Sequence, residues 1–160
     1  MKKMKKIVFM FLMLLITVTT VGQINTIDKP PKKTWKILIK NSKNKESNFQ
    51  LIGQTIIDND FSIEKKDFDY LTFETTPKTT DKNTSSYYLK FIAKDNLIVL
   101  TGMAKSLIEM NIGSVTLNNE YTKIKNIGMN GSITKDQFNS MLKFAKLFSS
   151  NESTFEFVVE

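Results

Sequence analysis

Apolar and polar residues alternate with a period of two along several short stretches of the chain, and this pattern indicates half-buried β-strands. The first stretch is 35–40, in which every second residue is apolar. Two short stretches, 61–63 and 71–73, flank a charged segment and predict a hairpin with its tip at 64–70. A last alternating stretch, 155–159, predicts a strand near the end of the sequence.

The longest alternating pattern covers residues 87–103 and predicts a β-hairpin that turns at Asp95-Asn96. In this register the pairs on one side consist of apolar residues or Gly: Ala93 with Ile98, Phe91 with Leu100, and Leu89 with Gly102. We expect this side to face the core, because a one-residue slip would turn all of these side chains to solvent.

Two stretches repeat their apolar residues every three or four positions, which predicts helices. In the first, residues 48–58, the apolar side consists of Phe49, Ile52 and Ile56. Ser47 or Asn48 is the expected N-cap of this helix. Gly53 is an unfavourable interior residue, which costs about 1 kcal/mol relative to Ala.

The second helix is expected to begin at a capping box formed by Thr134 and Gln137. Its apolar stripe consists of Phe138, Met141, Leu142, Ala145 and Phe148. Residues 107–112 and 121–127 each favour a further strand, because Gly and Asn turn residues bound them. The polar stretch 76–86 is expected to be a loop.

Hairpins dominate this pattern and helices are few. This favours an α+β fold, in which one antiparallel sheet has two helices packed on one face. The expected element order is β-α-β-β-β-β-α, with the last alternating stretch as an additional C-terminal strand. We expect residues 34–160 to form this single domain.

The first 22 residues have the three-part organisation of a secretory signal peptide. Four Lys precede an uninterrupted apolar run at 7–16, and small residues follow at Thr20 and Gly22. We expect cleavage near Gly22-Gln23 and export to the periplasm or the medium. The alternative is an uncleaved anchor, although a membrane-spanning helix needs about 20 apolar residues. Residues 23–33 are expected to form an extended tail, because they lack periodicity and contain two adjacent Pro.

The net charge of +7 is concentrated in the expected signal peptide. The rest of the chain has 19 of the 23 basic residues and all 16 acidic ones, which leaves +3. This is an ordinary charge for a soluble domain and not a footprint for nucleic acid. Every basic residue is Lys, so the planar fork with which Arg binds phosphate is missing. We therefore expect no nucleic-acid partner.

Cys and His are both absent from the sequence. Their absence excludes thiol nucleophiles, disulfides, Cys/His zinc sites and imidazole acid–base catalysis. It also excludes a lipoprotein anchored through an N-terminal Cys. We expect no cofactor and no metal, and no integral membrane segment after cleavage.

Two groups of acidic residues could carry chemistry. Asp58, Asp60 and Glu64 offer oxygen ligands for a cation, but their spacing lacks the Gly and the distant Glu of a calcium loop. Asp67 and Asp69 could form the carboxylate pair of a hydrolase, which needs one acid in a buried environment. The predicted hairpin tip favours two solvated acids instead.

Gly128 and Gly131 have the GxxG spacing of the loop with which KH domains clamp nucleic acid. The sequence Asn130-Gly131 by itself predicts a tight turn, which explains the same residues. A Ser–Lys pair is compatible with the composition, although no Ser occurs in a G-x-S-x-G motif.

The outward side of the 87–103 hairpin is the most distinctive candidate site. Its apolar residues form a strip that Lys side chains flank: Tyr88, Ile92, Val99 and Met103, with Lys90 and Lys94. An exposed apolar strip marks a partner or ligand surface. The alternative is that residues 105–130 or the N-terminal tail cover it.

A strand at Trp35-Lys36-Ile37-Leu38 leads into a helix, segments 61–67, 71–75 and 87–91 follow, and an amphipathic helix comes near the end. Over residues 34–150 this arrangement resembles small exported proteins of Bacteroidetes that carry a domain of unknown function with a TATA-binding-protein-like fold. It is also distantly similar to the repeated domain in the C lipoprotein of the outer-membrane β-barrel assembly machinery. It differs from that lipoprotein in having no lipidated Cys and a single domain. The resemblance implies this fold and an envelope location, and it implies no catalytic residues.

The function that these observations favour is a non-catalytic protein-binding or accessory module of the cell envelope. The alternative is a carrier of a small apolar ligand held between helices and sheet, because Phe and Met are abundant. A hydrolase that uses carboxylates or a Ser–Lys pair is the third hypothesis.

Overall fold

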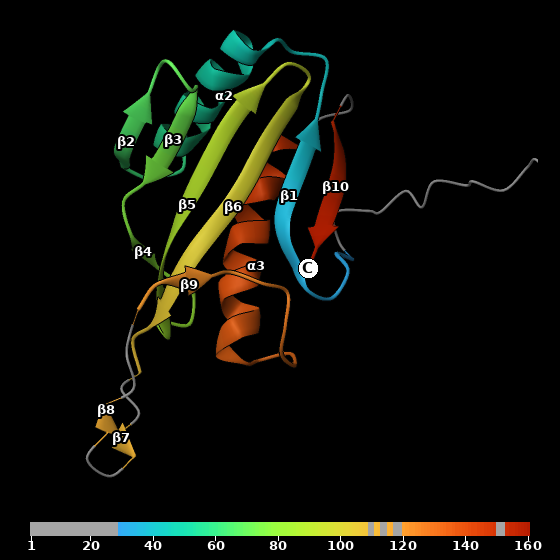
Figure 1. The fold of residues 1–160 in the computed structure, drawn as a ribbon. Coiled ribbons are helices and arrows are strands. Elements are labelled where there is room, and N and C mark those ends of the chain that lie inside the picture. Colours follow the sequence, from blue (N-terminus) through green and yellow to red (C-terminus); the bar gives the residue numbers. More distant parts are fainter. Residues whose placement is uncertain (1–28, 109–110, 113–114, 117–119, 150–152) are drawn as a thin grey trace, which may run out of the picture.

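The computed structural model describes residues 29–108, 111–112, 115–116, 120–149 and 153–160 (Figure 1). The predicted signal peptide, residues 1–22, lies outside the described residues, as does most of the predicted tail. Among the helices of the described residues, none combines the length and the apolar composition that crossing a membrane requires.

The described strands are β1 (Thr34–Lys40), β2 (Ile63–Asp67), β3 (Thr72–Thr75), β4 (Lys78–Thr79), β5 (Ser85–Lys94), β6 (Leu97–Ser106), β7 (Asn111–Ile112), β8 (Val115–Thr116), β9 (Thr122–Lys123) and β10 (Thr154–Val159). One antiparallel sheet has the order β10-β1-β6-β5-β3-β2, with β4 paired to β5 and β9 to β6 (Figure 1). Strands β7 and β8 pair with each other. The predicted α+β class is confirmed, and so is the strand expected at 155–159.

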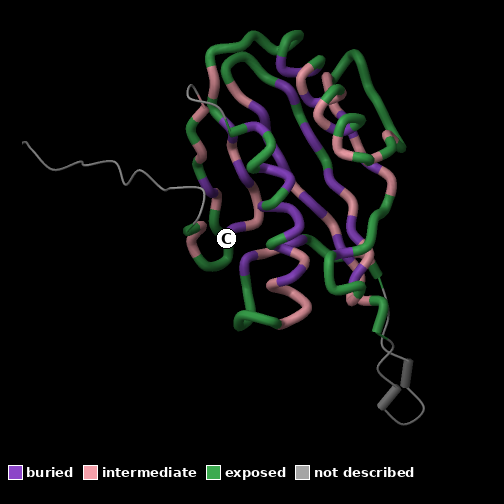
Figure 2. The backbone as a smooth tube through the Cα atoms, turned by 180° about the vertical axis from the view of Figure 1, so that it is seen from behind, coloured by how far each residue is buried: buried purple, intermediate pink, exposed green. Residues whose placement is uncertain are grey.

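The β5–β6 hairpin has the predicted register. Its inner pairs are Ala93 with Ile98, Phe91 with Leu100, and Leu89 with Gly102. All of these residues are buried, and buried residues alternate with partly or fully exposed ones along β5 (Figure 2). Asn96 has a φ of 60°, a region that Asn adopts more readily than most residues, so the two-residue turn forms as expected. Both strands are longer than predicted, because β5 begins at Ser85 and β6 ends at Ser106.

Helix α2 (Lys45–Asp58) begins earlier than predicted, and its N-cap is Asn44. The Asn44 side chain accepts a hydrogen bond from the Ser47 N–H at 2.8 Å, which satisfies one free donor of the first turn. The predicted cap at Ser47 or Asn48 is therefore wrong. Asn48 is fully buried and hydrogen-bonds backbone carbonyls instead, one of them on β5.

Helix α3 (Ile133–Ala145) continues into a 3-10 turn, η1 (Lys146–Phe148). Its N-cap is Ser132, which accepts a hydrogen bond from the Lys135 N–H at 3.3 Å. The predicted capping box is wrong, because its members bind other parts of the fold. Thr134 donates to the Ile127 carbonyl at 3.1 Å, and Gln137 donates to Ser85 Oγ on β5 at 2.9 Å.

Both helices cover the same face of the sheet, as predicted, and the core lies between them and the sheet (Figure 1). The helices contribute these buried apolar residues: Phe49, Ile52 and Ile56 from α2, and Phe138, Met141, Leu142, Phe144 and Ala145 from α3. A Cβ at Gly53 would lie 3.1 Å from the Phe73 ring, tighter than most such contacts. The interior Gly thus lets α2 approach β3 closely.

The region 105–130 differs from the prediction. Leu107 and Ile108 lie in a bend and are exposed, and Met110 lies outside the described residues. The strand expected at 121–127 shrinks to the two residues of β9. Ile124 follows it and is buried, and its Cδ1 lies 2.8 Å from where a Cβ of Gly102 would be. The side chain that Gly102 lacks therefore leaves room for Ile124. The expected loop 76–86 also contains β4.

Candidate functional site

The outward face of the sheet is the side opposite to the two helices. Ile92 pairs with Val99, and Val99 pairs with Leu38 on β1, so these three residues form one row across three strands. Opposite residues in such a row have Cβ atoms about 5 Å apart, so their side chains are in contact. We call this row, Leu38, Val99 and Ile92, the apolar row. Leu38 was not predicted as a site residue, because it lies between Lys neighbours on the polar side of its strand.

The predicted strip is not continuous. Tyr88 pairs with Met103, but the pair of Lys90 and Thr101 separates them from the apolar row. The Tyr121 ring packs edge-on against Tyr88 with 5.0 Å between ring centroids. The segment around β9 therefore partly covers the Tyr88 end, which agrees with the alternative stated for residues 105–130.

The apolar row is less covered than the Tyr88 end. Ile92 is 39% exposed, whereas Val99 is 8% exposed because its neighbours in the row flank it on both sides. Both helices of the described residues pack on the opposite face of the sheet. The row is thus a shallow apolar surface with Ile92 as its most accessible side chain.

Lys side chains surround the apolar row. Lys90 Nζ lies 3.0 Å from Glu74 Oε2. The hydrogen bond to Glu74 is the main reason that the pKa of Lys90 is raised above its usual value. Lys40 binds Glu156 at 2.5 Å. Within the described part of the chain, Lys36 and Lys94 form no ion pair. The outward face therefore carries an excess of positive charge.

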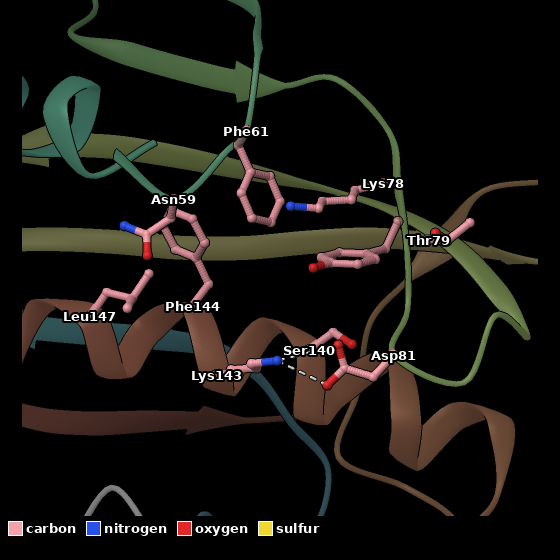
Figure 3. Close-up of a pocket in the computed structure, with 10 residues that line it drawn as sticks. Asn59, Phe61, Lys78, Thr79, Asp81, Ser140, Lys143, Phe144 and Leu147 are labelled. Carbon is pink, nitrogen blue, oxygen red and sulfur yellow. Dashed lines mark hydrogen bonds and ion pairs between the residues drawn. The ribbon is translucent and has the colours of Figure 1, made fainter. Parts of the chain in front are cut away.

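A separate cavity of about 190 Å³ lies between the β4 segment and α3 (Figure 3). The edge of the Phe61 ring meets Phe144, with 5.0 Å between centroids, and Lys78 Nζ lies 4.3 Å from the Phe61 centroid. Tyr87 also lines this cavity, and burial raises the pKa of its hydroxyl to about 12, with Asp81 acting in the same direction. The hydroxyl therefore stays protonated at any physiological pH.

Ser140 and Lys143 both line this cavity and are the members that a Ser–Lys pair would need. A nucleophilic Ser must lie within hydrogen-bond reach of its base. The Ser140 hydroxyl instead donates to the Asp136 carbonyl at 3.1 Å, and Lys143 Nζ lies 3.0 and 3.3 Å from the two Asp81 oxygens (Figure 3). Each group therefore has another partner in this arrangement.

Two of the acidic residues singled out in the sequence, Asp67 and Asp58, accept hydrogen bonds within their own turn or helix. Asp67 Oδ1 accepts hydrogen bonds from the backbone N–H groups of Asp69 and Tyr70, both at 2.9 Å, and so stabilises the β2–β3 turn. Asp58 Oδ1 accepts one from Gln54 at 2.6 Å on the exposed side of α2. Within the described residues, no three acidic side chains converge in a group that could hold a metal ion.

The GxxG spacing at Gly128 and Gly131 belongs to the turn that leads into α3. Both residues have positive φ, 84° and 91°. A Cβ at Gly128 would lie 2.4 Å from Ser132 Oγ and 2.5 Å from Thr134 Oγ1. Gly is therefore needed at residue 128 for the start of the helix, which explains it without a ligand.

Two buried Thr, Thr75 and Thr80, provide a matched prediction on stability. In the described part of the chain, Thr80 Oγ1 is buried with no hydrogen-bond partner, whereas Thr75 Oγ1 accepts the Leu89 N–H at 3.0 Å. Thr80→Val should raise the free energy of unfolding by about 1 kcal/mol, and Thr75→Val should lower it by about 1–2 kcal/mol. Urea unfolding of both variants measures this difference. Equal changes in the two variants would contradict the hydrogen-bond assignment.

Comparison with protein-family models, with curated proteins and with solved structures finds no match to this chain. The resemblance to the exported Bacteroidetes family therefore stays a prediction.

Proposed function

We propose that this protein is a non-catalytic binding module exported to the cell envelope, and that the outward face of its sheet docks an acidic segment of another envelope protein. The observation that carries the proposal is the apolar row, which lies on the face that the two helices do not cover. Export is the expectation from the first 22 residues.

The chemistry of the face favours this occupant. Ile92 and its row offer apolar area to an anchoring side chain, and burial of such area drives most association. Lys36 and Lys94 lack an ion pair among the described residues, so they attract carboxylates at the rim. Complementary charge of this kind mainly raises the association rate and fixes orientation. The fitting partner is a polypeptide segment with an apolar anchor between acidic residues.

Photo-crosslinking in the cells that make the protein tests the proposal. A photoreactive amino acid in place of Ile92 should give one reproducible adduct of higher mass, whereas the same replacement at Leu147, exposed on the helix side, should give none. Lys94→Glu should weaken the Ile92 adduct, and the matched change Lys82→Glu in an exposed loop should leave it unchanged.

Mass spectrometry of the adduct should place the crosslink in an acidic segment. The proposal fails if Ile92 gives no adduct, if Leu147 gives the same one, or if the two Lys variants behave alike. Thermal unfolding of Lys94→Glu is the control for folding, and we expect an unchanged midpoint because the side chain is exposed.

A further inference from the structure

A second open site lies on the helix side of the sheet, away from the outward face. It is a groove of about 680 Å³ between α2 and the β2–β3 hairpin. We call it the aromatic groove. Its apolar lining consists of Phe49, Gly53, Ile57, Ile63, Phe68, Leu71 and Phe73. Small-molecule sites have volumes of about 300–1,000 Å³, so the groove is of suitable size.

The groove presents its apolar residues to solvent. Phe68 is 68% exposed and Ile57 is 61% exposed, although both are large and apolar. The Phe68 ring packs edge-on against Phe49, with 5.6 Å between the ring centroids. Phe49 in turn stacks on Phe73, with centroids 4.4 Å apart and 25° between the planes. Three aromatic rings thus form one continuous wall.

Lys66 gives this wall a charge. Its Nζ lies 4.5 Å from the Phe68 centroid, 5.3 Å from that of Phe49 and 5.5 Å from that of Phe73. The neighbouring Lys65 points to the opposite side of the strand, where it pairs with Glu74 at 3.8 Å. Within the described residues Lys66 forms no ion pair, and the aromatic rings are the contacts of its ammonium that the structure shows.

The sign of this charge selects the ligand. A cation would be repelled by Lys66, which already occupies the ring faces. An anion would gain a charge-assisted hydrogen bond to the ammonium, and an attached hydrocarbon chain would gain burial against the rings and Ile57. Glu46 is the acidic residue in the lining, and its carboxylate lies 3.8 Å from Lys45 Nζ.

We propose that the aromatic groove binds a single-chain amphiphile with an anionic headgroup, which Lys66 holds while the hydrocarbon chain lies along Phe49, Phe68 and Ile57. This site is independent of the proposed docking face, because it lies between α2 and the hairpin. The proposal makes the second hypothesis from the sequence, a carrier of a small apolar ligand, more specific. It gives the binding site, the charge of the headgroup and the cation that positions it.

Calorimetric titration of the whole protein with decanoate, decyl phosphate and decyltrimethylammonium, each below its micelle concentration, tests the proposal. The two anions should bind at one site, and the cation of equal chain length should bind at least tenfold more weakly. Tighter binding of either anion also supports the proposal and identifies the headgroup class. The proposal would be overturned if all three amphiphiles bound equally, or if neither decanoate nor decyl phosphate bound.

Matched variants locate the site. Lys66→Glu should weaken decanoate binding at least tenfold, since a hydrogen bond to a charged group is lost and a repulsion is added, whereas Lys65→Glu should change it less than about twofold. Phe68→Ala should weaken decanoate binding about fivefold. Tyr70→Ala, which removes an even more exposed ring outside the groove, should leave the binding unchanged.

Lys66→Gln removes the positive charge without reversing it, so it tests the proposal even if Lys66→Glu disturbs the fold. This variant should lose most of the affinity for both anions. Decanoate-induced NMR shifts should concentrate on Ile57, Ile63 and Leu71. Equal affinities of Lys65→Glu and Lys66→Glu, or shifts confined to the outward face, would overturn the assignment.

Discussion

Replacement of Phe91 with Ala should lower the free energy of unfolding by about 3–5 kcal/mol. Phe91 is fully buried on β5, at the place where the sheet meets the end of α3. Its ring centroid lies 5.4 Å from that of Phe144 and 6.2 Å from that of Phe148. Truncation would therefore remove aromatic contacts to α3 and to η1 and would leave a cavity that neither element can fill without moving.

Urea unfolding followed by circular dichroism measures this loss. Phe68→Ala is the matched control, because it removes the same atoms from a ring that is 68% exposed, and it should cost less than about 1 kcal/mol. Phe91→Leu should fall between the two variants, since it keeps part of the buried volume. Similar losses in Phe91→Ala and Phe68→Ala would contradict the placement of Phe91 in the core.

The register and the turn of the β5–β6 hairpin could be predicted to the residue because two local signals agree, although both strands extend beyond the predicted bounds. The alternating pattern assigns one side of each strand to the core, and Asp95-Asn96 fits a two-residue turn. A shift of the register by one residue would bury Lys90 and Lys94, so the core alone selects the observed pairing. The stripe of α3 is similarly unambiguous, because Phe138 and Met141 have the helical spacing and are fully buried.

The helix caps could not be predicted, because several residues of the right type compete at each helix start. Asn44, Ser47 and Asn48 are all good N-caps by type, and tertiary contacts decide between them. The Asn48 side chain donates to the backbone carbonyls of Lys43 and Lys94, the second of which is 46 residues away in the sequence, and this leaves Asn44 as the cap. At α3, Ser85 and the Ile127 carbonyl take up the residues of the expected box in the same way.

In the candidate sites, too, the local pattern predicts some features, whereas others depend on tertiary contacts. Ile92 and Val99 were found because alternation places them on one side of a predicted hairpin, but their junction with Leu38 depends on β1 pairing with β6. The aromatic groove was missed, since Lys66 and Phe68 lie in a segment that the sequence assigns to a charged hairpin tip. Phe68 lies in the turn just after β2, so strand alternation does not predict its position beside Lys66. The two side chains come together through tertiary contacts, which include the contact of the Phe68 ring with Phe49 on α2.

Asn48 connects three parts of the fold at the start of α2. Its Nδ2 donates to the Lys94 carbonyl at 2.9 Å and to the Lys43 carbonyl at 3.2 Å. Its Oδ1 accepts a hydrogen bond from Asn41 Nδ2 at 2.8 Å. The side chain is fully buried, so water cannot replace these partners without opening the junction between the helix and the β5–β6 turn.

Asn48→Leu should therefore lower the free energy of unfolding by about 2–3 kcal/mol, because it keeps the side-chain volume but leaves buried polar groups unpaired. Asn44→Ala, which removes the cap alone, should cost about 1 kcal/mol. Urea unfolding ranks the two variants, and hydrogen exchange should show faster exchange at the first turn of α2 in both. Amides near the β5–β6 turn should exchange faster only in Asn48→Leu, since only that variant releases the Lys94 carbonyl. A loss in Asn48→Leu no greater than in Asn44→Ala, with an unchanged turn, would mean that Asn48 fills space and does not join the helix to the hairpin.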